Sequence, residues 1–471
     1  MNRISIIYPP ISARERYSSD IGNSGGKQIP LGIYYLASFM RSKNYDVQVT
    51  DGEVRNLTTE DILHQIKQFA PDYIGISSTT VAFHRALEVA NAIKSTLCSS
   101  PIILGGPHVT SNFEHGMSFS AFDFAVLGEG EFSLWELCEA LSRKNPLDNV
   151  EGIVYRNSDG LIKTQPRKYI ENLDVLPFPA YDLISDISLY NPPPSDYKEL
   201  PVISIITSRG CPGQCTFCDK SVFGSLYRRR SAENVFEEIQ MLRKQYGVRE
   251  INFVDDTFLI HKQRIYTLFS LLKEANIRVS WTCRGGRIVD VDREYLSFLK
   301  DNGCWSIAFG IESGDEDILK LIKKNISLDK VRQVVNWCHE LSIKTKGFFI
   351  LGHPSETKET TDKTIRFALS LKLDDVVTTI NTPIPGSMQY SQVSQYGSLD
   401  ETNWSEYNYW RPVFIPDGLS QEYLLQKHKE FYSRFYLRPR ILFRYFLSFF
   451  ARGGLRRLVA VMKSSLFLFK K

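Results

Sequence analysis

The sequence predicts an α/β protein with two successive parallel sheets and a helical C-terminal extension. Short apolar runs alternate with amphipathic stretches over residues 1–150 and again over 200–390, which is the pattern of repeated β/α units. Proline-rich stretches interrupt this alternation between the two regions, and an aromatic, then basic and helix-like segment follows the second one. We therefore expect a first domain at 1–150, a linker at 151–199, a second domain at 200–390 and an extension at 391–471.

The composition is that of an ordinary globular protein. Hydrophobic residues make up 43% and charged residues 23% of the 471 residues, and the formal net charge is +4. These values exclude wholesale disorder, and so small a charge gives no indication of nucleic-acid binding. The N-terminus lacks a signal-peptide layout, and no uncharged apolar run reaches the roughly 18 residues of a spanning helix. We expect a cytoplasmic protein with reduced thiols.

Five strands are expected to alternate with helices in the first domain. The strands are residues 4–8, 47–51, 73–78, 102–106 and 124–128. The helices between them are residues 31–43, 59–69, 82–97 and 131–143. This order predicts a Rossmann-like (flavodoxin-like) parallel sheet with helices on both faces.

The carboxyl ends of these strands carry small, polar or glycine residues. Ligands of open α/β sheets bind outside this edge, and glycines let the backbone approach a large ligand closely. The edge residues are Ser77, Thr79, Gly105, Gly106, His108, Gly128, Glu129 and Gly130. No G-x-G-x-x-G follows the first strand, so a dinucleotide site is unsupported. The alternative is that the glycines only turn the chain and that His108 bonds loop backbone.

Between the two domains, the pattern of residues 152–164 predicts a hairpin with Asp159 and Gly160 at its turn. Prolines crowd residues 176–179 and 192–194, where they cannot continue a helix or a central strand. We expect the connection between the domains there.

Three cysteines follow an apolar run at 201–206 with C-x3-C-x2-C spacing: Cys211, Cys215 and Cys218. Three thiolates on one loop indicate a soft metal, as an iron–sulfur cluster or as zinc. A compact set of three implies a distant fourth ligand or an iron left open to a substrate or cofactor. For zinc, Cys283 or His353 would be the fourth ligand, but x3 spacing fits structural zinc poorly.

Six strands are expected in the second domain, at 201–206, 251–255, 279–284, 306–311, 347–351 and 376–381. The helices between them are residues 231–246, 262–275, 292–301, 315–341 and 358–372. Six β/α units predict a partial barrel that is open on one side, with its chemistry at the carboxyl ends of the strands. Those ends are rich in carboxylates, arginines and glycines.

Both domains resemble parts of known families. The motifs L-G-G-P-H-V-T and L-G-E-G-E make residues 3 to about 145 similar to the cobalamin-binding domain attached to many radical S-adenosylmethionine enzymes. The D-x-H-x-x-G motif is absent, so the resemblance implies cobalamin without a histidine on cobalt, held at the strand-end residues named above. The cysteine spacing with F-V-D-D-T-F, F-G-I-E-S-G, L-G-H-P-S-E-T and T-P-I-P-G-S makes 200–390 resemble the radical S-adenosylmethionine superfamily and its barrel.

The second resemblance implies that the three cysteines hold a [4Fe-4S] cluster whose fourth iron takes the amino and carboxylate groups of S-adenosylmethionine. Cleavage of the sulfonium by an electron would then give methionine and a 5′-deoxyadenosyl radical. Phe217 is placed to shield the cluster, while Asp255, Glu312 and Ser313 are placed to bond the cofactor's ribose and amino groups. Arg284, with Arg287, is expected to pair with its carboxylate. Structural ion pairing is the alternative for the charged residues.

The extension contains four large aromatic residues within 404–410, which could line a pocket for an apolar substrate or simply pack. The tail at 435–471 predicts a basic amphipathic helix, which either docks on anionic lipid as a peripheral membrane contact or covers the barrel.

Together, the resemblances imply a cobalamin-dependent radical enzyme that methylates an unactivated carbon of a small molecule. The expected partners are that substrate and an electron donor such as flavodoxin or ferredoxin, with no nucleic acid. The alternative within enzymes is a radical cyclase, oxidase or rearrangement enzyme with the same cofactors. A non-catalytic corrinoid or cluster sensor is the alternative of another class. Transfer-RNA methylthiolation would need further cluster cysteines upstream, and Cys98 and Cys138 are too far apart to supply them.

Overall fold

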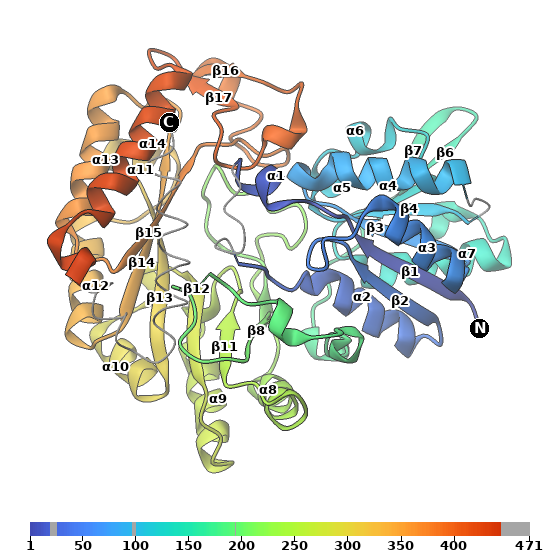
Figure 1. Ribbon diagram of the computed structural model, residues 1–471, viewed down its shortest axis with the longest axis horizontal. Coiled ribbons are helices and arrows are strands. Elements are labelled where there is room, and N and C mark those ends of the chain that lie inside the picture. The colour runs from blue at the N-terminus through green and yellow to red at the C-terminus, as the bar shows by residue number, and fades with distance from the viewer. Residues whose placement is uncertain (19–25, 97–99, 194, 444–471) are drawn as a thin grey trace.

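A computed structural model describes residues 1–18, 26–96, 100–193 and 195–443 as two α/β lobes that lie side by side (Figure 1). The N-terminal lobe contains residues of the first domain and the hairpin that follows it. The other lobe is the barrel-like second domain, and the C-terminal extension packs on top of it and reaches towards the first lobe.

The N-terminal lobe is built on a seven-stranded sheet of order β2-β1-β3-β4-β5-β6-β7. Its parallel part consists of β1 (Arg3–Tyr8), β2 (Asp46–Asp51), β3 (Tyr73–Ser77), β4 (Ile102–Gly105) and β5 (Phe124–Val126). The helices are α1 (Ala13–Tyr17), α2 (Leu31–Ser42), α3 (Thr59–Phe69), α4 (Phe83–Thr96), α5 (Pro107–Ser111), α6 (Phe113–Met117) and α7 (Gly130–Arg143). The predicted parallel sheet is therefore confirmed.

The hairpin expected at 152–164 is present as β6 (Ile153–Asn157) and β7 (Gly160–Lys163). It is not an isolated part of the connection between the lobes, because β6 pairs antiparallel with β5. The hairpin thus extends the first sheet beyond its parallel strands.

The second lobe contains a six-stranded parallel sheet of order β15-β14-β13-β12-β11-β8. Its strands are β8 (Val202–Ile205), β11 (Glu250–Phe253), β12 (Ser280–Gly286), β13 (Cys304–Glu312), β14 (Lys344–Leu351) and β15 (Asp375–Ile380). Helices α8 (Ala232–Tyr246), α9 (Lys262–Glu274), α10 (Arg293–Asp301) and α13 (Lys358–Ser370) connect them. Within the described residues β8 and β15 do not pair with each other, so the six predicted units form an open barrel.

The single helix predicted at 315–341 is wrong: the chain forms α11 (Glu316–Leu321) and α12 (Leu328–Glu340). Lys323 and Asn325 have positive φ angles of 53° and 51°, which a right-handed helix cannot accommodate. The Ser327 hydroxyl then accepts a hydrogen bond from Lys330 N and starts the second helix. Apolar residues keep a helical spacing on both sides of this break, so the sequence pattern did not reveal it.

The extension forms a two-stranded ribbon, β16 (Gly397–Leu399) with β17 (Phe414–Pro416), and helix α14 (Gln421–Tyr436). Helix α14 packs on β15, where the Tyr432 hydroxyl accepts a hydrogen bond from Thr378 N at 2.9 Å. Within the described residues, no helix is both long enough and apolar enough to cross a bilayer. The predicted lipid-docking tail falls mainly on residues 444–471, outside the described residues.

Candidate active site

The three predicted metal ligands lie on one closed loop. Strand β9 (Ser208–Arg209) pairs antiparallel with β10 (Arg228–Arg229), so the two ends of the segment 210–227 lie next to each other. A Cβ on Gly213 would lie 3.3 Å from the Cys211 sulfur and 4.0 Å from the Cys215 sulfur, so both sulfurs flank this glycine. A hydrogen bond from the Cys218 thiol lowers the pKa of Cys215 to about 6. We call residues 210–227 the cysteine loop.

No group of three or more His, Cys, Asp or Glu side chains in the described part of the chain is arranged to hold a single metal ion. The zinc alternative therefore gains no support, because a tetrahedral zinc site needs its ligands to converge on one atom. A cluster offers a different iron to each thiolate, so three neighbouring but separate sulfurs are compatible with it. The assignment of the cysteines to a cluster stays a prediction.

Phe217, in the cysteine loop, contacts the barrel through His353 and Lys324. The Phe217 ring lies 6.0 Å from the ring of His353, and the Lys324 Nζ lies 5.9 Å from the centre of the Phe217 ring. Lys324 also bonds a Glu312 carboxylate oxygen at 2.8 Å, with only 15% and 8% of the two side chains exposed. Lys324 could not be identified from the sequence, because it lies in the break between α11 and α12, where a single helix was predicted.

Asp255 fixes the start of the cysteine loop. One of its carboxylate oxygens accepts hydrogen bonds from Thr207 N at 2.9 Å, from the Thr207 hydroxyl at 2.8 Å and from the Ser208 hydroxyl at 2.5 Å. Complete burial raises the pKa of Asp255. This carboxylate therefore holds β8 and β9 in place, which is a role the sequence could not reveal.

Several buried polar atoms beyond the strand ends have no hydrogen-bond partner among the described residues. They are the second carboxylate oxygen of Asp255, the Thr257 hydroxyl, the Asn381 amide nitrogen and both side-chain polar atoms of Gln389. Buried polar groups without partners are uncommon, and they indicate a site that receives a polar ligand or water. For Asp255 and Thr257, which follow β11, the missing partner can be a hydroxyl or amino group of a ligand.

Two other predicted contacts of the same ligand already have protein partners. The Arg284 guanidinium pairs with Asp196, in the connection between the lobes, at 2.9 Å. The Ser313 hydroxyl lies 3.2 Å from the Thr364 hydroxyl of α13 and accepts a hydrogen bond from Asp315 N. For these two residues the predicted ligand role has no support from their side-chain contacts, and it stays a prediction.

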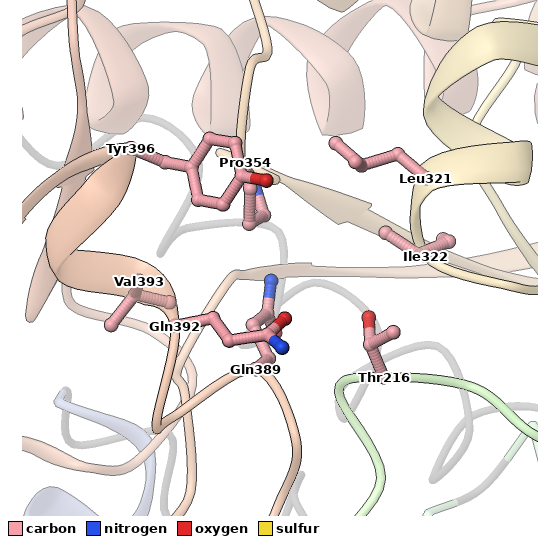
Figure 2. Close-up of a pocket in the computed structure, with 8 residues that line it drawn as sticks. All are labelled: Thr216, Leu321, Ile322, Pro354, Gln389, Gln392, Val393 and Tyr396. Atoms are coloured by element: carbon pink, nitrogen blue, oxygen red, sulfur yellow. The ribbon is translucent and has the colours of Figure 1, made fainter.

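The cavities near these residues differ in size. A cavity of about 460 Å³ is lined by residues of the cysteine loop, by Lys323 and by the segment after β15: Gln214, Cys215, Cys218, Lys220, Ser221, Ser225, Lys323, Gly386 and Met388. This volume is within the range of small-molecule sites. The second cavity, of about 20 Å³, has room for about one water molecule. Leu321 and Ile322 lie on its opposite side from Val393 and Tyr396 (Figure 2).

His353, after β14, gives a pH-dependent prediction. Burial lowers its pKa to about 3, so the unfolded chain binds a proton below pH 6.5 that the folded chain does not. The stability that neutral His353 contributes is present above pH 6.5 and is lost as the pH falls towards 3. Between pH 7 and pH 5 the difference in free energy of unfolding between the wild type and His353→Gln should therefore fall by about 2 kcal/mol. Urea unfolding at both pH values measures it, and an equal difference at both would contradict this account.

The carboxyl edge of the first sheet brings most of the other predicted residues together. The Thr79 hydroxyl is buried without a partner among the described residues. Gly106 has a φ of 96°, and a Cβ there would lie 2.7 Å from Ser78 O, so only glycine fits. Gly128 N donates a hydrogen bond to the Thr110 hydroxyl at 3.1 Å. Ser77, Gly105 and Gly130 lie at the same strand ends, where a large ligand would meet mostly backbone.

The His108 ring is enclosed by other side chains. The ring is fully buried, with one nitrogen 3.0 Å from His115 Nδ1 and the other 3.3 Å from the Thr80 hydroxyl. Trp404, from the aromatic stretch of the extension, packs 5.8 Å from the His108 ring. The alternative prediction, that His108 bonds loop backbone, is wrong, because its hydrogen-bond partners are the side chains of Thr80 and His115.

Glu129 contacts the second lobe. Its carboxylate lies 2.8 Å from both Arg209 and Arg228, the residues at the two ends of the cysteine loop. Glu131 pairs with Arg209 at 2.5 Å. The Ser111 hydroxyl, after β4, donates a hydrogen bond to Asp219 of the cysteine loop at 2.5 Å. The strand ends of the first lobe therefore hold the cysteine loop directly.

Comparison with known proteins connects both lobes to described families. Residues 205–368 match the model of the radical SAM superfamily, and residues 17–137 match that of the B12 binding domain. The chain is 35% identical to an uncharacterized methyltransferase of Pyrococcus horikoshii over 93% of this chain and 94% of that protein. It is 25% identical to the anaerobic magnesium-protoporphyrin IX monomethyl ester cyclase of Rubrivivax gelatinosus over 89% and 77%.

Among solved structures, the chain resembles TsrM of Kitasatospora setae, a radical S-adenosylmethionine methyltransferase, with a TM-score of 0.69. The match covers 93% of this chain and 90% of TsrM at 17% sequence identity. At this identity the similarity establishes the fold of both lobes and their order along the chain.

Proposed function

The chain belongs to the radical S-adenosylmethionine superfamily and carries a B12-binding domain ahead of its radical domain, and from this we propose that it is a cobalamin-dependent enzyme that methylates an unactivated carbon of a small molecule. One observation carries the proposal: the strand-end loops of the B12-binding domain contact the cysteine loop through Ser111 and pair with the arginines that flank the loop through Glu129 and Glu131. A reaction that uses both cofactors needs them close together. The Pyrococcus relative, which matches nearly the whole chain, bears the name methyltransferase.

In this proposal Cys211, Cys215 and Cys218 hold a [4Fe-4S] cluster, and cobalamin binds at the carboxyl edge of β3, β4 and β5. The fit rests on the three neighbouring thiols, on the partnerless carboxylate oxygen of Asp255 and hydroxyl of Thr257, and on the glycine-rich strand ends. When bound, the cluster supplies the electron that cleaves S-adenosylmethionine, and cobalamin carries the methyl group. The electron is expected from a reduced carrier such as flavodoxin or ferredoxin.

The chain's own residues prepare this site. Asp255 holds the start of the cysteine loop. Phe217, within the loop, packs its ring 6.0 Å from the ring of His353, where it would shield the cluster from water. Lys324 places a positive charge beside the cysteine loop, and Glu312 holds that charge in position. Glu312 has a positive φ of 69°, and a Cβ on Gly310 would lie 2.7 Å from Lys324 Nζ, so this arrangement depends on a glycine.

The test is an anaerobic assay of the full chain reconstituted with iron, sulfide and hydroxocobalamin. With S-adenosylmethionine and a strong reductant, we expect 5′-deoxyadenosine together with S-adenosylhomocysteine. Methylation uses one S-adenosylmethionine as the source of the radical, which gives 5′-deoxyadenosine, and a second as the source of the methyl group, which gives S-adenosylhomocysteine. Absence of 5′-deoxyadenosine from a chain that holds its cluster would overturn the proposal and favour a non-catalytic sensor.

The second candidate is a radical cyclase or oxidase with the same cofactors. The similarity to the magnesium-protoporphyrin cyclase over 89% of this chain favours it. It would give 5′-deoxyadenosine without S-adenosylhomocysteine, so the same assay separates the two candidates.

Lys324→Met should make the reduction potential of the cluster more negative. A positive charge near the cluster favours the added electron. Between two unit charges roughly 7 Å apart at an effective dielectric constant of about 20, Coulomb's law gives roughly 2 kcal/mol, on the order of 100 mV, and we expect a shift of this order. A redox titration followed by electron paramagnetic resonance measures this shift. Lys320→Met is the control, because Lys320 is 75% exposed and pairs with Asp317. Equal potentials in both variants would show that Lys324 does not act on the cluster.

A further inference from the structure

Four charged side chains are buried together between the two lobes. Arg209 pairs with Glu129 at 2.8 Å and with Glu131 at 2.5 Å, and Arg228 pairs with Glu129 at 2.8 Å. None of the four side chains is more than 6% exposed. Their charges cancel, so the group forms a neutral unit, which we call the inter-lobe anchor.

The anchor binds both ends of the cysteine loop. Arg209 lies in β9, two residues before Cys211, and Arg228 lies opposite it in β10. Arg228 also donates hydrogen bonds to Ile170 O and Phe223 O, and Arg209 lies over the ring of Phe223 at 5.1 Å. Movement of the loop as a whole therefore requires these ion pairs to break.

The acidic half of the anchor belongs to the predicted cobalamin edge. In residues 128–131, two glycines alternate with Glu129 and Glu131. The glycine backbone predicted to face cobalamin and the two carboxylates of the anchor therefore lie in the same four-residue segment. A second contact lies further along the loop, where Ser111 bonds Asp219 at 2.5 Å and Ser221 at 2.8 Å. Both strand-end segments that face the loop thus hold it.

Holding the two lobes together does not by itself require buried ion pairs such as those of the anchor. Apolar contacts would hold the interface equally well, because burying four charges costs desolvation energy that their attraction only roughly offsets. Ion pairs of this kind add a fixed geometry, since the planar guanidinium bonds carboxylates only in a narrow range of orientations. The anchor lies at the base of the cysteine loop, where fixed geometry has a chemical consequence.

We propose that Glu129 and Glu131 are positioning residues, which set the place of the cysteine loop relative to the B12-binding domain and so the separation of the two cofactors. The part about cofactor separation rests on the proposed function. The part about the loop concerns the protein without cofactors, and the two parts are tested separately.

The first test is hydrogen–deuterium exchange of the full chain without cofactors. In Glu129→Gln and Glu131→Gln, amide hydrogens of residues 208–229 should exchange at least about tenfold faster than in the wild type, while those of Cys304–Glu312 in β13 stay within about twofold. The control is Asp375→Asn, which removes a carboxylate from the largely buried Lys346–Asp375 pair at 2.9 Å, at the start of β15 and away from the anchor. Unchanged exchange at 208–229, or an equal increase in the control, would overturn the proposal.

A variant that leaves one charge buried alone can fail to fold. The double variant Arg209→Gln with Glu131→Gln removes one charge of each sign and keeps hydrogen-bonding side chains at both positions. It should fold and still show the faster exchange at 208–229. Wild-type exchange in this double variant would overturn the role of the anchor.

The second test uses the chain loaded with cluster and hydroxocobalamin, reduced so that both centres are paramagnetic. Their magnetic interaction broadens the resonance spectrum according to their separation. We expect one defined broadening in the wild type and in Asp375→Asn, and a weaker or heterogeneous one in Glu131→Gln at equal iron and cobalamin content. Identical spectra would overturn the positioning role. A chain that takes up neither cofactor would overturn the proposed function, and the exchange experiment would still decide whether the anchor holds the loop.

Discussion

Replacing Cys211, Cys215 or Cys218 by alanine is expected to abolish the reductive cleavage of S-adenosylmethionine. Each thiolate would hold one iron, and the loss of one leaves the cluster without enough ligands to keep its fourth iron for the cofactor. Anaerobically reconstituted variants should lose the resonance signal of the reduced [4Fe-4S] cluster and form no 5′-deoxyadenosine above background. Iron content measured beside the signal shows whether the cluster is absent or altered.

The matched control is Cys338→Ala. Cys338 is fully buried in α12, and burial raises the pKa of its thiol, so it is an inert packing residue. This variant should keep its cluster signal and its rate of 5′-deoxyadenosine formation within about twofold, with a modest loss of stability. Cleavage that persists in all three loop variants would remove the basis for the cluster, and loss of cleavage in the control would point to a general folding defect.

The sequence was sufficient for the succession of the parallel strands along the chain in both lobes. Strands of three to nine residues alternate with amphipathic helices, and this periodicity is a local property that the chain keeps in the folded state. The break at Lys323 and Asn325 escaped because two left-handed residues do not alter the apolar spacing. Lys324 was not predicted either, because it lies in this break, where it pairs with Glu312.

The sequence allowed candidate site residues to be placed at strand ends, but it did not allow their ion-pair partners to be predicted. Glu129 lies at the strand edge as expected, yet its carboxylate pairs with Arg209, 80 residues further along the chain. Arg284 lies at the end of β12 as expected, and its partner Asp196 is 88 residues away in the connection between the lobes. Local patterns predict which edge a side chain occupies, whereas the partner depends on how two lobes meet, which no local pattern encodes.

Gly285→Ala is expected to be the most destabilising single change near the site. Gly285 lies in β12, where the chain passes closely over the turn that follows β11. A Cβ there would overlap Asp255 O and lie 2.8 Å from Asp256 C. These are backbone atoms, so relief would require β11 and β12 to separate or Asp255 to lose its bonds to Thr207 and Ser208. We expect a loss of about 4 kcal/mol or more in the free energy of unfolding, or failure to accumulate as folded protein.

Gly32→Ala provides the matched control for this prediction, because a Cβ on Gly32 in α2 would meet no atom within 4 Å. Alanine there lowers the entropy of the unfolded chain and should leave stability unchanged or raise it by about 0.5–1 kcal/mol. Urea midpoints of the two variants, measured beside the wild type, test the difference. A Gly285→Ala midpoint equal to that of the wild type would mean that the turn after β11 can move aside. In that case the position of Asp255 would not be fixed by the packing of β12, and the proposed role of Asp255 in holding the start of the cysteine loop would be contradicted.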